Sequence, residues 1–583
     1  MDENLKKFRV ISAATLAIFL LVALYAFKLQ VLNGPTYYRI SEENYIKKIY
    51  VAAPRGRILD RRNIEIANTR PGFFVSVTPA IIDSASLQEV ARLLAVDPQA
   101  IRTKMAVEKN PYMSVKIAHD IPIEKFSIIE EILEDLKGVE VGVEPLRNYP
   151  YRATLCHLIG YVGEVTDVEL KASDKYLPGN YLGRMGLEEQ YEDILKGDDG
   201  VEYIEVDARG REVGQVLEKR PVPVTLGKDL QTSVDLALTE STARYLADYE
   251  KAAVVALDPR TGEILTLYSK PGFDPNLFVR GVGKVEWQAL NNSENAPMYN
   301  RAIMSCYPCG STFKPFIALA ALDAGMIDEN RCFESCPGQY ILGRRVFRCW
   351  KIHGRLALVD AIIHSCDVYF YQLGRFIGVD TISSRLRKCG FGQNTGVDLP
   401  QEKAGILPDR NWFAAKYGDY WTEGHILNLS IGQGDLLVTP IQLACAYSLF
   451  VNGGKIPKPH LLKSKKISYT LTGISPAALD VVCRGLKGVV SIGTGVMAQV
   501  RDIEVGGKTG TAENPHGEDH SWFVGYAPAN DPKILVCVLV ENAGHGGSVA
   551  APIAGKIIDA YLQLEAASRA PVPGKDSVYV QKN

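Results

Sequence analysis

Residues 307–316 read Tyr-Pro-Cys-Gly-Ser-Thr-Phe-Lys-Pro-Phe, and the next six residues, 317–322, are Ile-Ala-Leu-Ala-Ala-Leu. The Pro and Gly residues predict a turn, and the apolar run predicts a buried helix that starts at or near Ser311. Pro315 fits this helix only within its first turn, where no intrahelical N–H is required. Ser311 and Lys314 would then share one helix face, because they lie three residues apart.

This spacing of serine and lysine indicates nucleophilic chemistry. A serine hydroxyl is a weak nucleophile until a base takes its proton, and a lysine can be that base when burial or a neighbouring cation lowers its pKa. The positive end of the helix dipole also favours an oxyanion beside Ser311. Ser-x-x-Lys alone does not distinguish a nucleophile from a solvated lysine at a helix start, because ordinary composition gives about two such patterns by chance.

Two further elements follow in the chain. Ser-Cys-Asp at 365–367 precedes Val-Tyr-Phe-Tyr-Gln, which predicts a buried aromatic helix, and Lys-Thr-Gly-Thr at 508–511 follows two glycines. Ser-x-Asp is a weak pattern, since Ser-Val-Asp at 233–235 also fits it. Lys-Thr-Gly occurs once, where about a tenth of an occurrence is expected by chance. The three elements in this order are typical of acyl-transfer enzymes with a serine nucleophile.

An uncharged apolar segment runs from Val10 to Phe27, between basic residues on both sides. Its 18 residues span about 27 Å as a helix, enough for the core of a bilayer. A cleaved signal peptide and a core helix are the alternatives, but no small-residue cleavage site follows. We expect an uncleaved anchor at 10–28, with residues 1–9 inside and the remaining bulk exported.

The length of 583 residues predicts several domains. Residues 29–225 have mixed composition and no catalytic constellation, so they are interpreted as a scaffold and spacer. The charged stretch at 54–63 is either solvated surface or a brace between subdomains. The chain carries a formal charge of −2, and no basic stretch with interleaved aromatic residues indicates nucleic-acid binding, so no nucleic-acid partner is expected.

A second domain is predicted at 226–566. Residues 253–258 and 263–268 give a strong hairpin signal. The Lys-Thr-Gly segment, 520–526 and 534–540 predict three more strands, and a closing helix covers about 552–565. Strands at both ends with helices between them favour an α+β fold, with one sheet covered by helices. The Pro- and Gly-containing tail, 567–583, is predicted to be disordered.

Nearly the whole chain resembles the class B penicillin-binding proteins, in particular the penicillin-binding protein 2 type that acts in cell elongation. Besides the anchor and the three elements above, the resemblance rests on the segments 55–61 (Arg-Gly-Arg-Ile-Leu-Asp-Arg), 183–191 (Gly-Arg-Met-Gly-Leu-Glu-Glu-Gln-Tyr), 257–263 (Leu-Asp-Pro-Arg-Thr-Gly-Glu), 273–276 (Phe-Asp-Pro-Asn), 300–302 (Asn-Arg-Ala) and 430–434 (Ser-Ile-Gly-Gln-Gly). It implies a β-lactamase-like transpeptidase domain, an antiparallel sheet with helices, on an elongated α+β pedestal.

The resemblance implies a peptidoglycan D,D-transpeptidase. Ser311 would attack the D-Ala-D-Ala carbonyl of a stem pentapeptide, release the terminal D-Ala and pass the acyl group to an amine of a neighbouring strand. Lys314 would be the base, and Ser365 would bridge Lys314 and Lys508 and relay a proton to the leaving amine. Lys508 would also supply positive charge for the terminal carboxylate of the substrate.

The same resemblance places substrate binding at Thr509, Gly510 and Thr511. Thr509 would hydrogen-bond the terminal carboxylate, and the backbone N–H groups of Ser311 and Thr511 would form an oxyanion hole, worth about 3 kcal/mol per donor. β-Lactams would acylate Ser311 as substrate mimics. Asp367 is expected to contact substrate, although the wider family usually has Asn there and an ionised Asp cannot donate a hydrogen bond.

The resemblance also implies a single-pass protein of the inner (cytoplasmic) membrane, with its catalytic domain in the periplasm. Its expected partners are stem peptides, β-lactams, a SEDS-family (RodA-like) glycosyltransferase and the elongation complex. Three alternatives stay open: a β-lactamase or sensor, which would need a deacylating glutamate that is not found after 365–367; a D,D-carboxypeptidase; and a scaffold that mainly activates the glycosyltransferase.

Four metal-ligand types are spaced C-x12-C-x3-H-x12-C at Cys336, Cys349, His353 and Cys366. Three thiolates and an imidazole suit tetrahedral Zn²⁺, and relatives have a similar cluster around their His-Gly-Arg. A structural zinc is therefore expected, with one disulfide plus free thiols as the alternative and Cys332 as an alternative ligand. Cys306-x-x-Cys309 matches a redox pair only in spacing, because no thioredoxin-like context surrounds it.

Overall fold

The structure is a computed structural model of the chain, and it describes residues 2–37, 46–108, 110–173, 175–177, 179–207, 212–216, 219–515 and 517–569. The described chain forms two compact units. The first comprises residues up to 55, 69–146 and 196–227, and the second comprises 56–68, 147–195 and 228 onward. Most of the predicted disordered tail lies outside the described residues.

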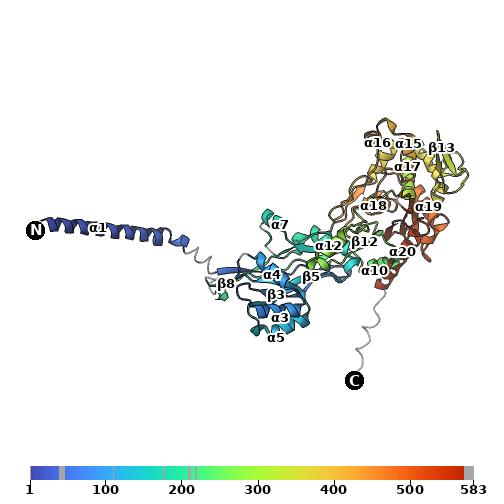
Figure 1. Cartoon of the computed structure of the whole chain (residues 1–583). Coiled ribbons are helices and arrows are strands. Elements are labelled where there is room, and N and C mark those ends of the chain that lie inside the picture. The colour runs from blue at the N-terminus through green and yellow to red at the C-terminus, as the bar shows by residue number, and fades with distance from the viewer. Residues whose placement is uncertain are drawn as a thin grey trace, which may run out of the picture. The chain divides into compact units, whose positions relative to one another are not determined.

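The N-terminal segment is helical, as predicted. Helix α1 (Asp2–Phe27) continues into a π-helical turn, η1 (Lys28–Leu32) (Figure 1). Among the described helices, this segment alone is long and apolar enough to cross a membrane, with a mean hydropathy of 2.5 over its apolar window. None of that window is buried inside the protein, so the core-helix alternative is wrong. Length and composition fit a membrane anchor, although a signal sequence has the same properties.

The first unit contains strands of two sheets. In one, β1 (Ile46–Val51) and β9 (Glu212–Gln215) flank β8 (Gly200–Val206). In the other, β3 (Glu65–Val77) pairs with β4 (Val115–Ile121) and with β5 (Val139–Asn148). The helices that complete the core of this second sheet are α3 (Ser84–Leu94), α4 (Pro98–Val107) and α5 (Ile123–Glu131).

Helix starts in this unit follow ordinary capping chemistry. The Asp83 carboxylate accepts a hydrogen bond from the backbone N–H of Ser86, and Asp97 accepts one from Gln99, with Pro98 in the first turn. Both helices turn apolar residues, among them Leu87 and Ile101, onto the sheet.

The second unit is built on a five-stranded antiparallel sheet. Its order is β12 (Ile264–Lys270), β11 (Ala252–Leu257), β19 (Ile534–Val540), β18 (His520–Ala527) and β17 (Gly506–Ala512). The predicted hairpin and three strands are therefore confirmed. Ala252 pairs with Val540, so the first and last parts of the domain meet in the middle of the sheet, and β17 is left as an edge strand.

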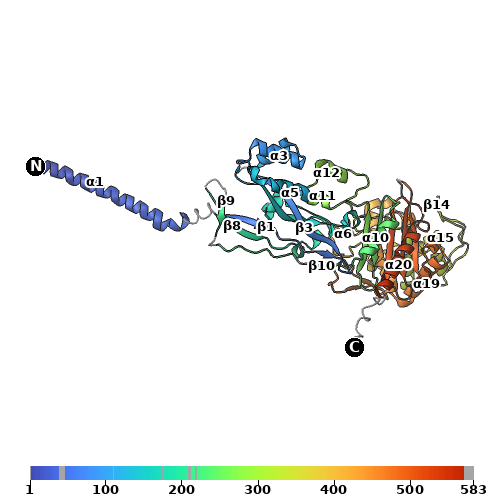
Figure 2. The same ribbon diagram turned by 90° about the horizontal axis from the view of Figure 1, so that it is seen from below.

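Helices cover both faces of this sheet, which explains why its central strands are buried at every position. Helices α10 (Leu236–Tyr245) and α20 (Ala550–Arg569) lie side by side over one face, where alternate residues of β11 and β19 meet Ile557 and Ile558 (Figure 2). Helix α18 (Pro440–Val451) contacts the same strands and is buried from Pro440 to Phe450. The predicted α+β class is confirmed.

Between β12 and β17 the chain forms a layer of helices that carries the inserts. Its members are α11 (Asn276–Val279), α12 (Lys284–Asn291), α13 (Lys314–Asp323), α14 (Leu358–Ile363), α15 (Asp367–Lys388), α16 (Arg410–Tyr417), α17 (Glu423–Ser430) and α19 (Pro476–Ser491). A two-stranded hairpin, β13 (Gln339–Leu342) and β14 (Arg345–Arg348), packs on α15, close to α17 (Figure 1). A second small hairpin pairs β15 (Lys455–Pro457) with β16 (Tyr469–Leu471).

The segments 56–68 and 147–195 also belong to the second unit. Strand β2 (Ile58–Leu59) pairs with β3 and with β10 (Leu230–Gln231). The short elements that follow are α6 (Cys156–Ile159), β6 (Val162–Glu164), α7 (Asp167–Ala172), β7 (Tyr181–Gly183), α8 (Gly186–Gln190) and α9 (Glu192–Leu195). Asp60 is buried, and Arg62 pairs with Asp235 at 2.9 Å, so the charged stretch acts as a brace within this unit.

A buried ion pair joins two of these segments. Arg147 Nε lies 2.6 Å from Glu188 Oε1, and both side chains are almost fully buried. Arg147 also donates to the carbonyl of Gly56 at 2.7 Å. Removal of one partner leaves a buried charge without its counterion, which is more costly than loss of the pair as a whole.

We predict that Arg147→Met lowers the free energy of unfolding by about 3–5 kcal/mol. Arg92→Met is the matched control, because Arg92 pairs with Glu89 on an exposed helix surface and such pairs contribute about 0.3–0.5 kcal/mol. Thermal unfolding of the detergent-solubilised chain, followed by far-UV circular dichroism, measures both changes. Equal, small shifts for the two variants would contradict the prediction.

Candidate active site

The segment around Ser311 forms a 3₁₀ turn, η4 (Gly310–Phe313), that leads directly into α13. The α-helix therefore starts at Lys314, three residues later than the earliest start predicted from the sequence, and Pro315 lies in its first turn as expected. In a 3₁₀ turn, residues i and i+3 eclipse each other, so Ser311 and Lys314 still share one side.

Glycines let three backbones meet at this turn. Gly310 has φ +55°, and a Cβ there would lie 2.3 Å from the carbonyl oxygen of Thr511 on β17. Its N–H donates to the carbonyl of Gly432 at 2.9 Å, in the Ser-Ile-Gly-Gln-Gly motif. A Cβ on Gly510 would lie 2.6 Å from the carbonyl of Cys309. Gly510, predicted as a substrate-binding residue, therefore lets β17 approach the backbone of Cys309 closely, and it offers no side chain to a substrate.

The Ser-Cys-Asp element forms the turn between α14 and α15. Ser365 adopts φ +54°, which is uncommon for a residue with a side chain and is found at strained functional positions. In this conformation both the carbonyl oxygen and the hydroxyl of Ser365 contact Lys314 Nζ, at 2.8 and 3.1 Å. The strained turn therefore presents two acceptors to one amine.

Lys314 is fully buried and has a third acceptor. Its Nζ lies 2.7 Å from Asp367 Oδ1, and it lies 5.6 Å from the ring centroid of Phe370. Burial raises the pKa of the Asp367 carboxyl, and the Lys314 charge opposes that effect. Three acceptors match the three N–H donors of an ammonium group. Asp367 therefore acts directly on Lys314, as a hydrogen-bond acceptor and counterion.

Lys508 is also fully buried, but it has fewer partners. Its Nζ donates to the carbonyl of Thr509 at 3.2 Å. Burial lowers the pKa of the Lys508 amine well below its ordinary value of 10.5, and the neighbouring Lys314 charge lowers it further. Lys508 was expected to supply positive charge to the terminal carboxylate of a substrate. The environment instead favours its neutral form when no anion is bound.

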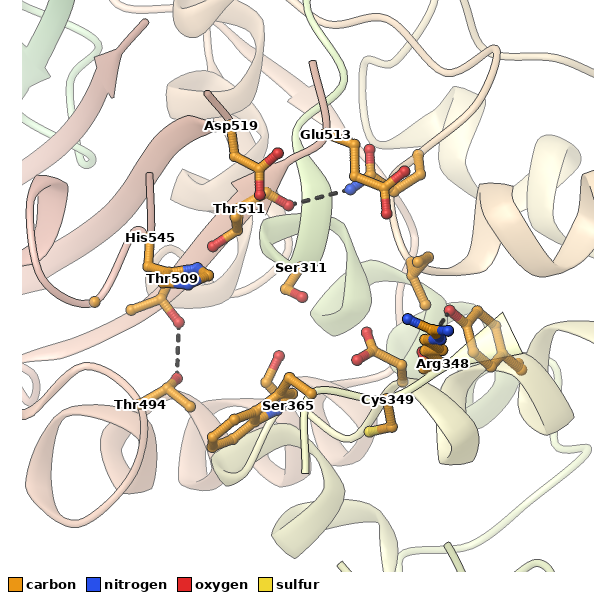
Figure 3. Close-up of a pocket in the computed structure, with 16 residues that line it drawn as sticks. Ser311, Arg348, Cys349, Ser365, Thr494, Thr509, Thr511, Glu513, Asp519 and His545 are labelled. Carbon is orange, nitrogen blue, oxygen red and sulfur yellow. Dashed lines mark hydrogen bonds between the residues drawn. The ribbon is translucent and has the colours of Figure 1, made fainter. Parts of the chain in front are cut away.

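A cavity of about 650 Å³ opens beside these groups (Figure 3). Of the predicted residues, Ser311, Ser365, Asp367, Thr509 and Thr511 line it, while Lys314 and Lys508 lie buried behind its wall. The three sequence elements therefore converge on one pocket.

Several pocket residues had no predicted role. Thr494 exchanges a hydrogen bond with Thr509, with 2.7 Å between the hydroxyl oxygens, and Gln433 donates to the carbonyl of Thr511 at 3.2 Å (Figure 3). Gln433 belongs to a motif already noted in the sequence, which is the one signal that could have found it. The others have no local pattern that indicates a role. Arg348 ends β14 and Tyr371 lies on α15, while the loop residues are Trp350, Glu513, Asp519 and His545.

The four predicted metal ligands lie together. One ligand atom from each of Cys336, Cys349, His353 and Cys366 falls within 4.8 Å of the others. His353 Nδ1 lies 3.4 Å from the Cys349 sulfur and 3.8 Å from the Cys336 sulfur. A tetrahedral set with Zn–S of about 2.3 Å and Zn–N of about 2.0 Å has ligand–ligand separations of roughly 3.5–3.8 Å, which the two His353 distances match, while the 4.8 Å limit on the whole cluster is wider. The set therefore fits Zn²⁺ in chemistry and in spacing.

The remaining cysteines do not join this cluster. Cys332 is not part of it, and all eleven cysteines are free thiols, so the structure contains no disulfide among them. Cys309 is fully buried, and burial raises the pKa of its thiol to about 12. Burial also raises the pKa of Cys306. Thiols with raised pKa values are poor redox centres, which disfavours a Cys306–Cys309 redox pair.

Family models match most of the chain. The penicillin binding protein transpeptidase domain matches residues 252–559, and the penicillin-binding protein dimerisation domain matches residues 50–232. The chain belongs to the penicillin-binding protein family. The resemblance inferred from the sequence is thereby confirmed.

Relatives within the family match this chain over nearly its whole length. The peptidoglycan D,D-transpeptidase MrdA of Acinetobacter baumannii is 34% identical over 96% of this chain and 88% of its own. The complex of penicillin-binding protein 2 and MreC from Helicobacter pylori has a TM-score of 0.80 at 28% identity, covering 90% of this chain and 100% of that one. A structure of a peptidoglycan synthase complex that coordinates polymerization and crosslinking has a TM-score of 0.73 at 30% identity, covering 96% and 98%.

We predict that Lys508→Met stabilises this penicillin-binding protein at pH 7. Between the lowered folded-state pKa and the unfolded value near 10.5, the unfolded chain binds more protons, so the unfavourable contribution of Lys508 weakens as pH rises through that window. The unfolding midpoint of the variant should exceed that of the wild type at pH 7, and the difference should shrink towards pH 10.

The exposed Lys388→Met is the control for loss of a lysine charge. Its midpoint should follow the wild type at both pH values. A Lys508→Met variant that is less stable than the wild type at pH 7, or whose advantage is the same at pH 10, would refute the electrostatic interpretation.

Proposed function

We propose that this chain cross-links peptidoglycan during cell elongation as a serine D,D-transpeptidase, with the acyl group carried on Ser311. One observation carries this proposal: the Ser311 turn, the Lys314–Ser365 contact and the Lys-Thr-Gly strand meet in one pocket. The named activity of the MrdA relatives supports it, because they match the chain almost end to end.

Acylation begins with attack of Ser311 Oγ on the carbonyl of the penultimate D-Ala. Lys314, as the free amine, takes the serine proton, and the oxyanion is held by the N–H groups of Ser311 and Thr511. Collapse of the tetrahedral intermediate breaks the peptide bond, and the leaving amine receives a proton through Ser365. The terminal D-Ala then departs and leaves an ester on Ser311.

The two lysines supply a way to activate the base when substrate arrives. In the free enzyme, the three acceptors around Lys314 suit an ammonium, whereas burial favours a neutral Lys508. The terminal carboxylate of the substrate raises the proton affinity of Lys508, because an opposite charge favours the protonated amine. The Ser365 hydroxyl already contacts Lys314 at 3.1 Å, and it would have to reach Lys508 Nζ, which here donates to Thr509, once substrate is bound. Transfer of one proton from Lys314 through that hydroxyl to Lys508 then leaves Lys314 ready to accept the proton of Ser311.

Thr509 and the edge strand hold the substrate. The Thr509 hydroxyl, positioned by Thr494, donates to the terminal carboxylate. Because β17 is the edge of its sheet, its outer backbone groups are available to an extended peptide. Asp367 acts by orienting Lys314 and, at the pocket wall, by accepting hydrogen bonds from substrate N–H groups.

The second half-reaction passes the acyl group to an amine. The acceptor amine attacks the ester carbonyl, loses one proton to the Lys314 and Ser365 relay, and forms the new peptide bond as Ser311 regains its hydrogen. Glu513 and Asp519 line the same pocket and suit the positive charge of an arriving ammonium. The acyl group would instead pass to water in a D,D-carboxypeptidase, which is the second candidate activity.

We place the catalytic domain (226–566) in the periplasm, with the 10–28 segment as a single anchor in the inner membrane, residues 1–9 inside and 29–225 as the pedestal. The apolar helix and its basic flank support this orientation. A SEDS-family glycosyltransferase and the elongation complex are the proposed partners, because one structural relative is a peptidoglycan synthase complex and another is bound to MreC.

We propose Zn²⁺ as a structural ion held by Cys336, Cys349, His353 and Cys366. The ion would fix the Cys366 backbone and with it the neighbouring Ser365, while the chemistry on Ser311 needs no cofactor. His353 presents Nδ1 to the thiols, and its buried Nε2 has no hydrogen-bond partner among the described residues. With no hydrogen bond at Nε2, the His353 ring would be oriented by its bond to the ion through Nδ1.

Fluorescent penicillin labelling tests the assignment of Ser311. We expect the full chain in detergent to form a covalent adduct that turns over slowly, and Ser311→Ala to form none. Rapid release of the adduct would identify a β-lactamase, and absence of labelling in the wild type would identify a scaffold. Analysis of crosslinked and of hydrolysed products from uncrosslinked strands then separates transpeptidase from carboxypeptidase.

Metal analysis tests the zinc proposal. We expect about one Zn²⁺ per chain in the purified protein and a marked loss in Cys349→Ser, with a lower unfolding midpoint, because a structural ion contributes to folding. Cys483→Ser is the control, since that cysteine lies outside the cluster. A wild-type protein without metal, or a Cys349→Ser variant with full occupancy, would overturn the proposal.

A further inference from the structure

A strongly basic segment borders the catalytic pocket. Residues 335–359 contain no Asp or Glu, but they contain five basic residues, all exposed: Arg344, Arg345, Arg348, Lys351 and Arg355. None of the five side chains forms an ion pair or hydrogen bond with another described residue. The whole chain has a formal charge of −2, so this concentration of positive charge is local. We call residues 338–355 the basic hairpin.

The strand register shows which side of the hairpin faces solvent. Gln339 pairs with Arg348, Tyr340 with Phe347 and Ile341 with Val346, so these pairs alternate between the two faces. Tyr340 and Phe347 contact Tyr371 of α15, with ring centroids 6.4 and 5.5 Å apart. The opposite face, with Ile341 and Val346 at 60% and 53% exposure, has no partner among the described residues.

The exposed face is continuous with the site of chemistry. Arg348, at the end of β14, and Trp350, which is 60% exposed, both line the catalytic pocket. The Trp350 ring N–H donates to the carbonyl of His364 at 3.2 Å, which fixes the indole beside the Ser365 turn. A molecule that extends out of the pocket on this side therefore meets Trp350 and Arg348. Arg345, in register with Leu342, lies on the face of Tyr340 and Phe347 and is also exposed.

The pocket itself is divided by charge. In the view of Figure 3, Arg348 lies below Ser311, while Glu513 and Asp519 lie above it. The reaction uses two peptides of opposite character at their reacting ends, a donor that ends in a carboxylate and an acceptor that presents an amine. The terminal carboxylate of the donor is assigned to Thr509 and Lys508, so Arg348 suits a further carboxylate that lies outside the reacting end. Asp367, which also lines the pocket, is paired with Lys314.

We propose that the basic hairpin binds the carboxylate-bearing stem peptides of an uncrosslinked peptidoglycan strand outside the pocket, while one donor peptide of that strand reacts at Ser311. This inference rests on the proposed function and names the form of the substrate, a polymer with repeated anionic peptides. A strand held at several peptides raises the effective concentration of the next donor at the pocket. The exposed apolar residues contact the uncharged parts of the same strand.

The test measures strand binding with the pocket closed. The full chain in detergent is first acylated with penicillin, which confirms a folded site and blocks Ser311. Binding of fluorescently labelled, soluble pentapeptide strands is then followed by anisotropy. We expect Arg344→Glu combined with Arg345→Glu, at the hairpin tip and away from the proposed metal ligands, to weaken binding by about tenfold at low ionic strength.

Three comparisons make the result specific. The double variant Lys388→Glu, Lys466→Glu changes the net charge equally at exposed sites elsewhere and should bind strands as the wild type does. Strands with amidated carboxylates should bind the wild type about as weakly as natural strands bind the hairpin variant. The wild-type affinity should fall steeply with salt, and the affinity of the hairpin variant should fall less.

Several outcomes would overturn the inference: unchanged binding by the hairpin variant, an equal loss in the control variant, no effect of amidation, or preferential binding to vesicles of anionic phospholipid, which would make the hairpin a membrane-contacting surface. Failure of penicillin to acylate the wild type would refute the proposed function itself, before any strand is added. Acylation followed by hairpin-independent binding would refute only the role of the hairpin.

Discussion

The site depends on the requirement that the buried Lys314 amine be fully hydrogen-bonded. A lysine with no exposed surface is costly unless its donors are satisfied, and here one turn supplies all three acceptors. Two come from Ser365, whose positive φ turns its carbonyl and hydroxyl the same way, and one comes from Asp367. This constraint fixes the start of α13 against the α14–α15 turn, and Ser311 is positioned by the same helix start.

The insert between α13 and α14 gains a structural purpose from this constraint. A residue with positive φ and a side chain is strained, so the surrounding structure must hold it in place. Cys366 directly follows Ser365 and belongs to the four-ligand cluster, and Cys349 belongs both to that cluster and to the basic hairpin. An ion bound there would tie the strained turn to the hairpin. The relay serine and the proposed strand-binding surface would then be held by one small centre.

The sequence predicted the elements that depend on the pattern of neighbouring residues. Apolar runs with flanking turns gave the strands β11, β12, β18 and β19, because buried strands need nothing beyond such a pattern. Ser311 and both lysines were predicted as site residues because their motifs are specific and ordered, and the structure brings them to one pocket. The helix start at Ser311 was less accurate, since a 3₁₀ turn and the first turn of an α-helix have the same residue preferences.

What the sequence could not supply depends on distant contacts. The pairing of Lys314 with Asp367 joins residues 53 positions apart, and the contrast between the two buried lysines follows from packing alone. The basic hairpin was missed for a different reason. Its five basic residues are spread over twelve positions among apolar ones, and only the fold gathers them on one exposed segment beside the pocket.

The presence of two buried lysines also explains how this site can lower the folding stability of the protein and still be reactive. If stability were the sole requirement, an apolar residue at 508 would be preferable, because burial disfavours the charged amine and, among the described residues, it donates only to the carbonyl of Thr509. Retention of an amine there is useful when an anionic group enters and supplies the missing charge. In the proposed reaction, the terminal carboxylate of a donor peptide is such a group. It would stabilise the ammonium form of Lys508, and the attraction between the two charges would contribute to substrate binding. Substrate recognition and activation of the base are then two consequences of one buried, underpaired amine.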